Sequence, residues 1–582
     1  MKKYIGISIL ALGLGLTSCS DSFLDKTPDE RVELTSVEDV VMLLGTAYSE
    51  TNYGWMCEVS SDNIIDINAP FKATQSGGDE IEVRFNLTSY NRMDDEAFCF
   101  EPVKSSTSWD SPSWIWEDGY KAIAVANHAI SVLDNLRGDQ PLDQCSNAMK
   151  AAYAEAYLTR AYNHFVLVNV FSQAYRDEEL SKLDVGVPYV TAPEDIVHGQ
   201  YDRESVTATY KHIQEDLERG LKYQSDLNFQ KPKWHFNNKA AHAFAARFYL
   251  YKRDYAKVIE HANVVLGDNT TEGRASLPTI LYNWAANDEA TNAVDYAEIW
   301  QGPDQPNNLL LVVTNSVHWR RAVGYRYATA GKALRDVYGH LTSCSRYYWN
   351  PVAGVADKYY WDGNSDHGYK SSRIAERFEY SDKVAGIGTP HIIRREFTCT
   401  ELLLERAEAE LLGNKDLAGC VEDLIAYENS RQNFSESTKA AYATGLSAPT
   451  KAAMDSWYAS TQAGSHSNVF ADWNFTQEIS PSFVVTPEQV TYMNAINDMR
   501  RYETAWTGLR FFDLKRLGIS YTHVYGPDAV KYEIKAHDRR LAIELPQEVL
   551  LSGLENSHPA VSMEGGNSSV APATPLMISN EK

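Results

Sequence analysis

The sequence predicts a mainly α-helical protein built from tetratricopeptide-like helix pairs with long irregular insertions. Apolar residues recur at three- and four-residue steps over many segments of the 582-residue chain. Small alanines stand beside large aromatic residues on these faces, as close-packed antiparallel helices require. Hydrophobic residues make up 44% of the chain, which excludes disorder over most of its length.

The N-terminus has the layout of a bacterial secretory signal. Two lysines precede an apolar run over residues 5–16, which is too short to span a bilayer as a helix. Small residues then lead to Cys19, an arrangement that resembles the lipobox of lipoproteins. The sequence therefore predicts a signal peptide over residues 1–18, acylation of Cys19 and a lipidated tether over residues 19–34. A plain signal peptide with an incidental cysteine is the alternative.

The region from 35 to 267 is predicted to contain the first helix pairs. One apolar face runs from Ile123 to Leu133 and the next covers residues 147–171. The connection between them is short, which indicates a helical hairpin. Asp202 is a plausible N-cap for the following helix, and two more apolar faces lie between residues 241 and 265.

The region from 399 to 582 is predicted to contain further helix pairs. The first helix covers Thr400 to Leu412 and ends at a Gly-Asn pair, and the next covers Asp416 to Glu428. Thr486-Pro487-Glu488-Gln489 offers a capping box with proline at the first helical position. A last helix is predicted from Glu503 to Leu517.

Two charged groups on these late helices are predicted to be structural. Arg510, Asp513 and Arg516 lie three residues apart, which suits ion pairs along one helix face. The glutamates between Glu405 and Glu410 occupy helical positions that are typical of a solvated or helix-pairing face. We therefore do not interpret them as paired catalytic carboxylates.

Residues 268–398 form the largest stretch without helical periodicity, and long insertions on a helical scaffold often carry binding sites. A sugar ring can stack its C–H face on an aromatic side chain while polar neighbours bind its hydroxyls. The alternative is that these aromatic residues pack the insertion onto the helices. The candidate ligand residues in this insertion are Trp319, Arg320, Tyr325, Tyr348, Trp349, Tyr359, Tyr360 and Trp361.

Composition and motifs exclude several functions. The excess of 78 Asp and Glu over 54 Lys and Arg gives a net charge of −24, which disfavours nucleic acid as a partner. No H-E-x-x-H or G-x-S-x-G motif supports hydrolase chemistry. The segment Asp362–Asp366 has alternating oxygen ligands but lacks the glycine and glutamate of an EF-hand, so no cofactor is predicted and only an irregular calcium site stays open. The six cysteines besides Cys19 contain no C-x-x-C pair and are either buried thiols or disulfides.

Six short motifs follow one another along the chain: Ser61-Asp62-Asn63, Trp116 to Asn127, Gly186 to Tyr189, Arg203 to Val206, Glu405 to Ala409, and Gly508 to Arg516. This order, together with the lipobox, resembles the SusD/RagB family of outer-membrane nutrient-binding lipoproteins, which are SusD-like and starch-binding-associated. The resemblance spans nearly the whole chain. It departs from the family pattern at Thr507, where an acidic residue often precedes the glycine, and in the loosely matching segment Ile543–Pro546.

The resemblance implies a lipid-anchored, non-enzymatic protein on the cell surface of the outer membrane. The implied partners are an oligosaccharide or polysaccharide nutrient and a SusC-like TonB-dependent transporter that receives it. A RagB-like peptide-binding protein is the alternative, and a secreted glycoside hydrolase is a further one. The resemblance also implies a ligand loop before the first helical hairpin, which adds Trp109, Asp66 and Asn68 to the candidate ligand residues.

Overall fold

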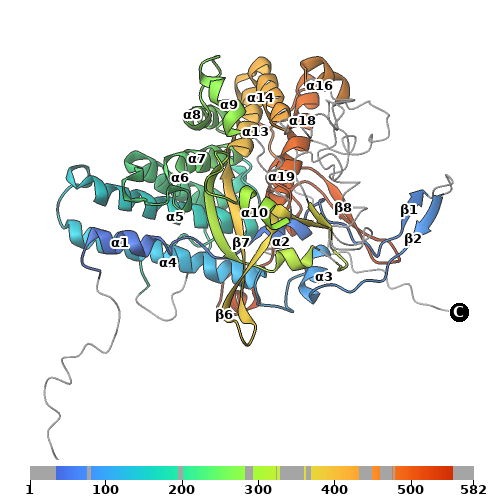
Figure 1. The fold of residues 1–582 in the computed structure, drawn as a ribbon, viewed down its shortest axis with the longest axis horizontal. Coiled ribbons are helices and arrows are strands. Elements are labelled where there is room, and N and C mark those ends of the chain that lie inside the picture. The colour runs from blue at the N-terminus through green and yellow to red at the C-terminus, as the bar shows by residue number, and fades with distance from the viewer. Residues whose placement is uncertain are drawn as a thin grey trace, which may run out of the picture.

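The computed structural model describes residues 34–74, 80–194, 201–281, 293–322, 324–327, 359–361, 369–431, 449–458, 475 and 479–554. Helices dominate these residues, and they stack in successive layers along the molecule (Figure 1). The predicted α-helical fold class is therefore confirmed. Within the described ranges, no helix is both long and apolar enough to cross a membrane.

The N-terminal layers are antiparallel helix pairs. Helix α5 lies between α4 and α6, and α7 packs against α8 (Figure 1). Side chains of Ser111, Ser146, Asn237 and Asp254 cap four of these helices, as the sequence chemistry favours. The helices are α1 (Val37–Leu44), α4 (Pro112–Arg137), α5 (Asn147–Phe171), α6 (Val206–Tyr223), α7 (Asn238–Lys252) and α8 (Tyr255–Leu266).

The predicted start of α6 at Asp202 is wrong. The N-cap is Ser205, whose side chain accepts the N–H of Ala208 at 3.2 Å. Residues before it are held by backbone contacts instead, since the N–H of Gly186 donates to the carbonyl of Glu204 at 2.6 Å. The segment that contains Asp202 is therefore part of the connection to α6, not part of the helix.

The C-terminal layers contain a second group of paired helices. Gln489 accepts the N–H of Thr486 at 2.9 Å, which confirms the capping residues predicted for α18. The helices here are α13 (Cys399–Ala409), α14 (Leu417–Ser430), α16 (Lys451–Trp457), α18 (Pro487–Glu503), α19 (Leu509–Leu517) and α20 (Gln547–Leu551). Shorter helices elsewhere are α2 (Gly54–Val59), α3 (Arg92–Phe98), α9 (Leu277–Ile280), α10 (Ala293–Trp300) and α11 (His318–Arg321).

Two predicted helix ends in this region are wrong. The helical segment that follows α13 ends at Lys415, which adopts the left-handed conformation, and not at Gly413. Gly413 instead leaves room for the side chain of Tyr255 on α8. The predicted helix from Glu503 to Leu517 is interrupted before α19 begins. There Gly508, with φ of 88°, brings the chain against Cys57 and Gly54 of α2, and a side chain at Gly508 would contact both.

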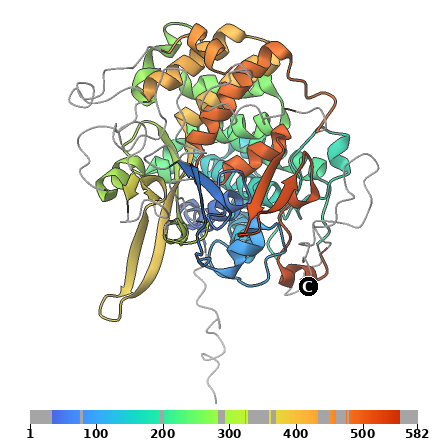
Figure 2. The same ribbon diagram turned by 90° about the vertical axis from the view of Figure 1, so that its right-hand side faces the viewer.

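The region predicted as an irregular insertion contains an antiparallel sheet. Its strand order is β3-β7-β6, and the β6–β7 hairpin projects beyond the helical body (Figures 1 and 2). Within the described residues there are also three two-stranded sheets, of which β4-β5 lies in this region. The strands are β1 (Phe71–Thr74), β2 (Glu80–Val83), β3 (Asn308–Asn315), β4 (Tyr359–Trp361), β5 (Tyr369–Ser371), β6 (Glu376–Asp382), β7 (Ile387–Thr398), β8 (Tyr521–Tyr525) and β9 (Val530–Ile534).

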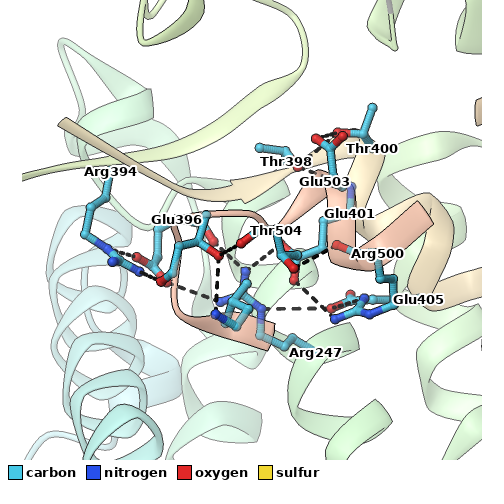
Figure 3. A network of polar contacts seen from close by, with 12 residues as sticks. Arg247, Arg394, Glu396, Thr398, Thr400, Glu401, Glu405, Arg500, Glu503 and Thr504 are labelled. Atoms are coloured by element: carbon cyan, nitrogen blue, oxygen red, sulfur yellow. Dashed lines mark hydrogen bonds and ion pairs between the residues drawn. The ribbon is translucent and has the colours of Figure 1, made fainter. Parts of the chain in front are cut away.

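A buried network of arginines and carboxylates joins the sheet to the helix layers (Figure 3). Arg247 of α7 lies 3.3 Å from Glu396 of β7 and 2.7 Å from Glu401 of α13. Arg394 binds Glu396 from the same strand at 3.0 Å, and the hydroxyl of Tyr53 donates to Glu396 at 2.7 Å. Because an unpaired charge is costly to bury, these partners constrain one another's positions.

The network continues into α18 and α19. Asp513 binds Arg500 at 3.0 Å and Arg516 at 2.7 Å, which confirms an ion pair along α19. Arg516 also binds both oxygens of Glu408 on α13, at 2.5 and 2.8 Å. The glutamates from Glu405 to Glu410 are thus a helix-pairing face, and the prediction that they could be solvated is wrong because they are 1–2% exposed.

The two family motifs farthest apart in the sequence contact each other. Both oxygens of Asp62 accept hydrogen bonds from Arg510, at 2.7 and 2.8 Å. Glu58 accepts the backbone N–H groups of Trp506 at 3.0 Å and Gly508 at 3.3 Å. The segment around α2 is therefore fixed to the turn between α18 and α19, although more than 400 residues separate them.

The cysteines within the described ranges are buried thiols. Burial raises the pKa of both Cys57 and Cys399 to about 12, so each stays protonated at neutral pH. Cys344 lies outside the described residues. The thiols in question are Cys57, Cys99, Cys145, Cys399 and Cys420.

We expect Arg247→Met to lower the free energy of unfolding by about 3–5 kcal/mol, because it leaves Glu401 buried without its closest cation. The matched control is Arg137→Met, which removes a partly exposed pair with Asp134 and should cost less than about 1 kcal/mol. Urea unfolding followed by circular dichroism measures both. Equal losses in the two variants would show that the network does not hold the layers together.

Candidate ligand-binding surface

Helix α11 carries two of the predicted ligand residues at the end of strand β3. Consecutive residues on a helix point about 100° apart. Trp319 is accordingly half-buried against the edge of the core, Arg320 is exposed, and Arg321 is fully buried. This four-residue helix therefore exposes Arg320 and part of Trp319, while the buried His318 and Arg321 anchor it.

Arg321 fixes α11 to the N-terminal part of the molecule. Its guanidinium lies 2.5 Å from Asp94 of α3 and 3.6 Å from Asp110. It also lies 4.8 Å from the ring centre of Tyr90 and 5.7 Å from that of Trp55, within range of cation–π attraction. Arg321 thus fixes the helical turn that carries Trp319 through two carboxylates and two aromatic rings.

Asp110 ties the loop that carries Trp109 to the start of α11. Its carboxylate accepts the N–H of Val317 at 3.1 Å, and its φ of 66° is unusual for a residue other than glycine. Burial raises the pKa of Asp110 to about 6, with Arg321 opposing the shift. Trp109 itself is half-buried, beside this fixed residue.

Tyr325 and Arg320 contact two residues that the sequence did not predict, Tyr90 and Phe378. The ring of Tyr325 meets that of Tyr90 edge to face, with centres 5.0 Å apart. Arg320 binds both oxygens of Glu376 on β6 at 2.8 Å, and its guanidinium lies 5.7 Å from the ring centre of Phe378. We call Tyr90, Trp319, Arg320, Tyr325 and Phe378 the aromatic surface.

The missed residues carry little signal in the sequence. Tyr90 is a lone aromatic in a polar segment, and Phe378 stands in the insertion that lacks helical periodicity. The alternation Phe378-Glu379-Tyr380 is typical of a strand and could have placed two aromatic side chains on one face. Their proximity to Arg320 depends on the fold, and no local pattern predicts it.

Asp66 and Asn68 are buried inside the molecule. Asp66 is 3% exposed and binds the guanidinium of Arg326 at 2.8 and 2.5 Å. Asn68 is 6% exposed and exchanges two hydrogen bonds with the backbone of Leu87, at 2.9 and 2.8 Å. Both therefore support the loops beneath Tyr325, and we do not carry them into the proposed ligand site.

The structure describes only some of the other ligand residues that the sequence predicts. Tyr348 and Trp349 lie outside the described residues, as does the possible calcium loop Asp362–Asp366. Tyr359, Tyr360 and Trp361 form strand β4, which pairs with β5 in antiparallel register. Among the residues that the structure describes, no cluster of three or more His, Cys, Asp or Glu side chains could hold a metal ion.

A cavity of about 580 Å³, its opening included, lies between β7 and the end of α18. Its aromatic wall comes from Trp300 and Trp506. Its arginines are already engaged, since Arg395 lies 3.8 Å over the ring of Trp300 and Arg373 donates to the carbonyl of Tyr502 at 2.6 Å. We take the aromatic surface, and not this cavity, as the candidate site because it contains Trp319, Arg320 and Tyr325, which the sequence predicts as ligand residues. The fold is thus a scaffold of paired helices that carries the aromatic surface at α11 and β6.

Comparisons with known proteins agree with this class. Residues 22–250 match the model of a SusD-like family described as starch-binding and associating with the outer membrane. No curated protein matches the sequence. The resemblance to SusD-like proteins that the sequence predicted is confirmed over residues 22–250.

Solved SusD structures share the fold over most of the chain. A SusD superfamily protein from Bacteroides thetaiotaomicron is 16% identical, with a TM-score of 0.51 over 90% of this chain and 100% of that one. A SusD superfamily protein from Bacteroides vulgatus is also 16% identical, with a TM-score of 0.52 over 90% and 99% of the two chains. A SusD-like carbohydrate binding protein from Bacteroides vulgatus is 14% identical, with a TM-score of 0.50 over 91% and 99%.

The neighbouring arginines of α11 should differ sharply in their effect on stability. Arg321→Ala should lower the free energy of unfolding by about 3–5 kcal/mol because it leaves Asp94 and Asp110 buried without their cation. Arg320→Ala removes a pair whose arginine is 41% exposed and should cost less than about 1 kcal/mol. Urea unfolding monitored by tryptophan fluorescence distinguishes the two. A large loss in the Arg320 variant would contradict its assignment to the surface.

Proposed function

We propose that this protein is a cell-surface lipoprotein that binds an oligosaccharide or polysaccharide nutrient and delivers it to a TonB-dependent outer-membrane transporter. The observation that carries the proposal is the aromatic surface, in which half-exposed rings surround a surface arginine and sit on the buried anchor Arg321. The matched family, described as starch-binding and outer-membrane associated, supports the same reading.

The surface suits sugar recognition for physical reasons. The rings of Trp319 and Tyr325 are rigid, so stacking on them costs little conformational entropy. The Arg320–Glu376 pair adds donors and acceptors at the edge of a stacked ring, where sugar hydroxyls lie. Trp109, on the loop fixed by Asp110, adds a further aromatic side chain close to α11. Trp319, Arg320, Tyr325 and Trp109 are the ligand residues that we propose.

The proposed role is non-catalytic. Glycoside hydrolysis uses two carboxylates that face the scissile bond from either side. Two carboxylates beside the aromatic surface are instead bound by arginines, Glu376 by Arg320 and Asp94 by Arg321. We therefore favour capture and transfer of an unmodified ligand.

Peptide binding is a second candidate function, and one observation favours it. Within the described residues, β6 is an edge strand of the sheet β3-β7-β6, so its outer edge pairs with no other described strand. An extended peptide could add to such an edge through backbone hydrogen bonds. The glycan proposal is preferred because it also uses the side chains of the aromatic surface.

Trp319→Ala should weaken glycan binding at least about tenfold, which corresponds to about 1.4 kcal/mol, because it removes a stacking ring. Isothermal titration against starch, β-1,3-glucan, xylan, mannan and a mixture of peptides measures the affinity. The matched control is Trp234→Ala, a half-buried tryptophan near the opposite end of β3. Peptide binding without any glycan binding would favour the second candidate function.

Cys19→Ser should abolish acylation and release the protein from the membrane fraction, because no other lipid attachment is proposed. Metabolic labelling with palmitate and fractionation of cells measure the two effects. Cys145→Ser, which alters a buried thiol in the folded body, is the control and should leave both unchanged. A Cys19 variant that still sediments with membranes would contradict the proposed anchor.

A further inference from the structure

Strand β6 carries a line of side chains that begins at the aromatic surface and leads away from it. Alternate residues of a strand share one face, so Glu376, Phe378 and Tyr380 point to the same side. Exposure rises along this line, since Glu376 and Phe378 are partly buried whereas Tyr380 is 51% exposed. The outer end of the line is therefore open to a ligand.

Close contacts connect this line to the rest of the aromatic surface. The rings of Phe378 and Tyr380 meet edge to face with centres 4.8 Å apart. Arg320 lies 5.7 Å from the ring centre of Phe378, and it also interacts with Tyr90, which contacts Tyr325. The contacts thus run without a break from Tyr325 to Tyr380, across three separate segments of the chain.

The hairpin that carries Tyr380 is fixed at its base. The inner end of β7 is buried, and β6 is clamped to α11 by the two hydrogen bonds between Arg320 and Glu376. A two-stranded hairpin alone is only marginally stable in water, so this clamp matters for its position. Beyond it the hairpin projects from the body (Figures 1 and 2).

We propose that β6 extends the ligand site, so that the protein binds a long neutral glycan chain along the line from Tyr325 to Tyr380. This inference rests on the proposed function. The charge of Arg320 is balanced by Glu376, and the exposed Glu379 and Asp382 of the hairpin are matched by the exposed Arg377 and Lys383. The line therefore carries no excess positive charge that would select a polyanionic chain, whereas a neutral polysaccharide can stack on the successive rings.

The test compares short and long ligands in two hairpin variants. Phe378→Ala with Tyr380→Ala removes the outer rings, and Val384→Ala with Ile387→Ala alters two exposed apolar residues at the tip, outside the line. Each variant and the parent chain are titrated with four neutral glycans, starch, β-1,3-glucan, xylan and mannan, and with the anionic homogalacturonan. Each glycan is used as its trisaccharide, its octasaccharide and its polymer. Circular dichroism confirms that both variants keep the parent's fold.

We consider the neutral glycan that the parent binds. The aromatic variant, with Phe378→Ala and Tyr380→Ala, should bind its trisaccharide with an affinity within about twofold of the parent's. The same variant should bind the octasaccharide and the polymer about tenfold more weakly than the parent does. The tip variant should match the parent throughout. If the parent binds trisaccharide and the aromatic variant binds octasaccharide as tightly as the parent, the extension is wrong while the proposed function stands. Tighter binding of homogalacturonan than of any neutral glycan overturns the neutral class. If the parent binds no glycan, both proposals fall.

Discussion

The pairing of buried arginines with buried carboxylates is the constraint on which the rest of the structure depends. Arg247, Arg500 and Arg516 come from three different helices, and each is almost completely removed from water. A charge in that environment is tolerated only when its partner is in place with good geometry. Apolar packing alone would allow neighbouring helices to slide, whereas these pairs fix the sheet and the helix layers in one register.

The same principle positions the candidate site. Arg321 is buried between Asp94 and Asp110, which leaves the adjacent Arg320 exposed and Trp319 half-buried. The exposed Arg320 then binds Glu376 and brings β6 against α11. The buried ion pairs thus determine where the aromatic surface lies. Of the two adjacent arginines, Arg321 anchors α11 inside the molecule and Arg320 binds β6 at the surface.

Regular helices could be predicted from the sequence, whereas charged interiors and the sheet could not. The helix over residues 147–171 was predicted with its observed bounds, because its apolar period is long and a serine caps it. The sequence left Glu408 on a solvated or a helix-pairing face and could not decide between them, since its partner Arg516 lies far away in the sequence. Strand β7 places Arg394 and Glu396 in the interior, so the usual apolar alternation of a buried strand is missing. Trp319, Arg320 and Tyr325 could be proposed from composition, but Tyr90 and Phe378 join them only through the fold.

The contact between α2 and the turn after α18 has a consequence for the order of folding. Asp62 and Glu58 receive their partners from residues 506–510, so the beginning of the domain cannot satisfy its polar groups while the end is still missing. Contacts this remote in sequence form late, since a very long loop must first close. The segments 58–62 and 506–510 therefore reach their final arrangement together, because each supplies hydrogen-bonding partners to the other.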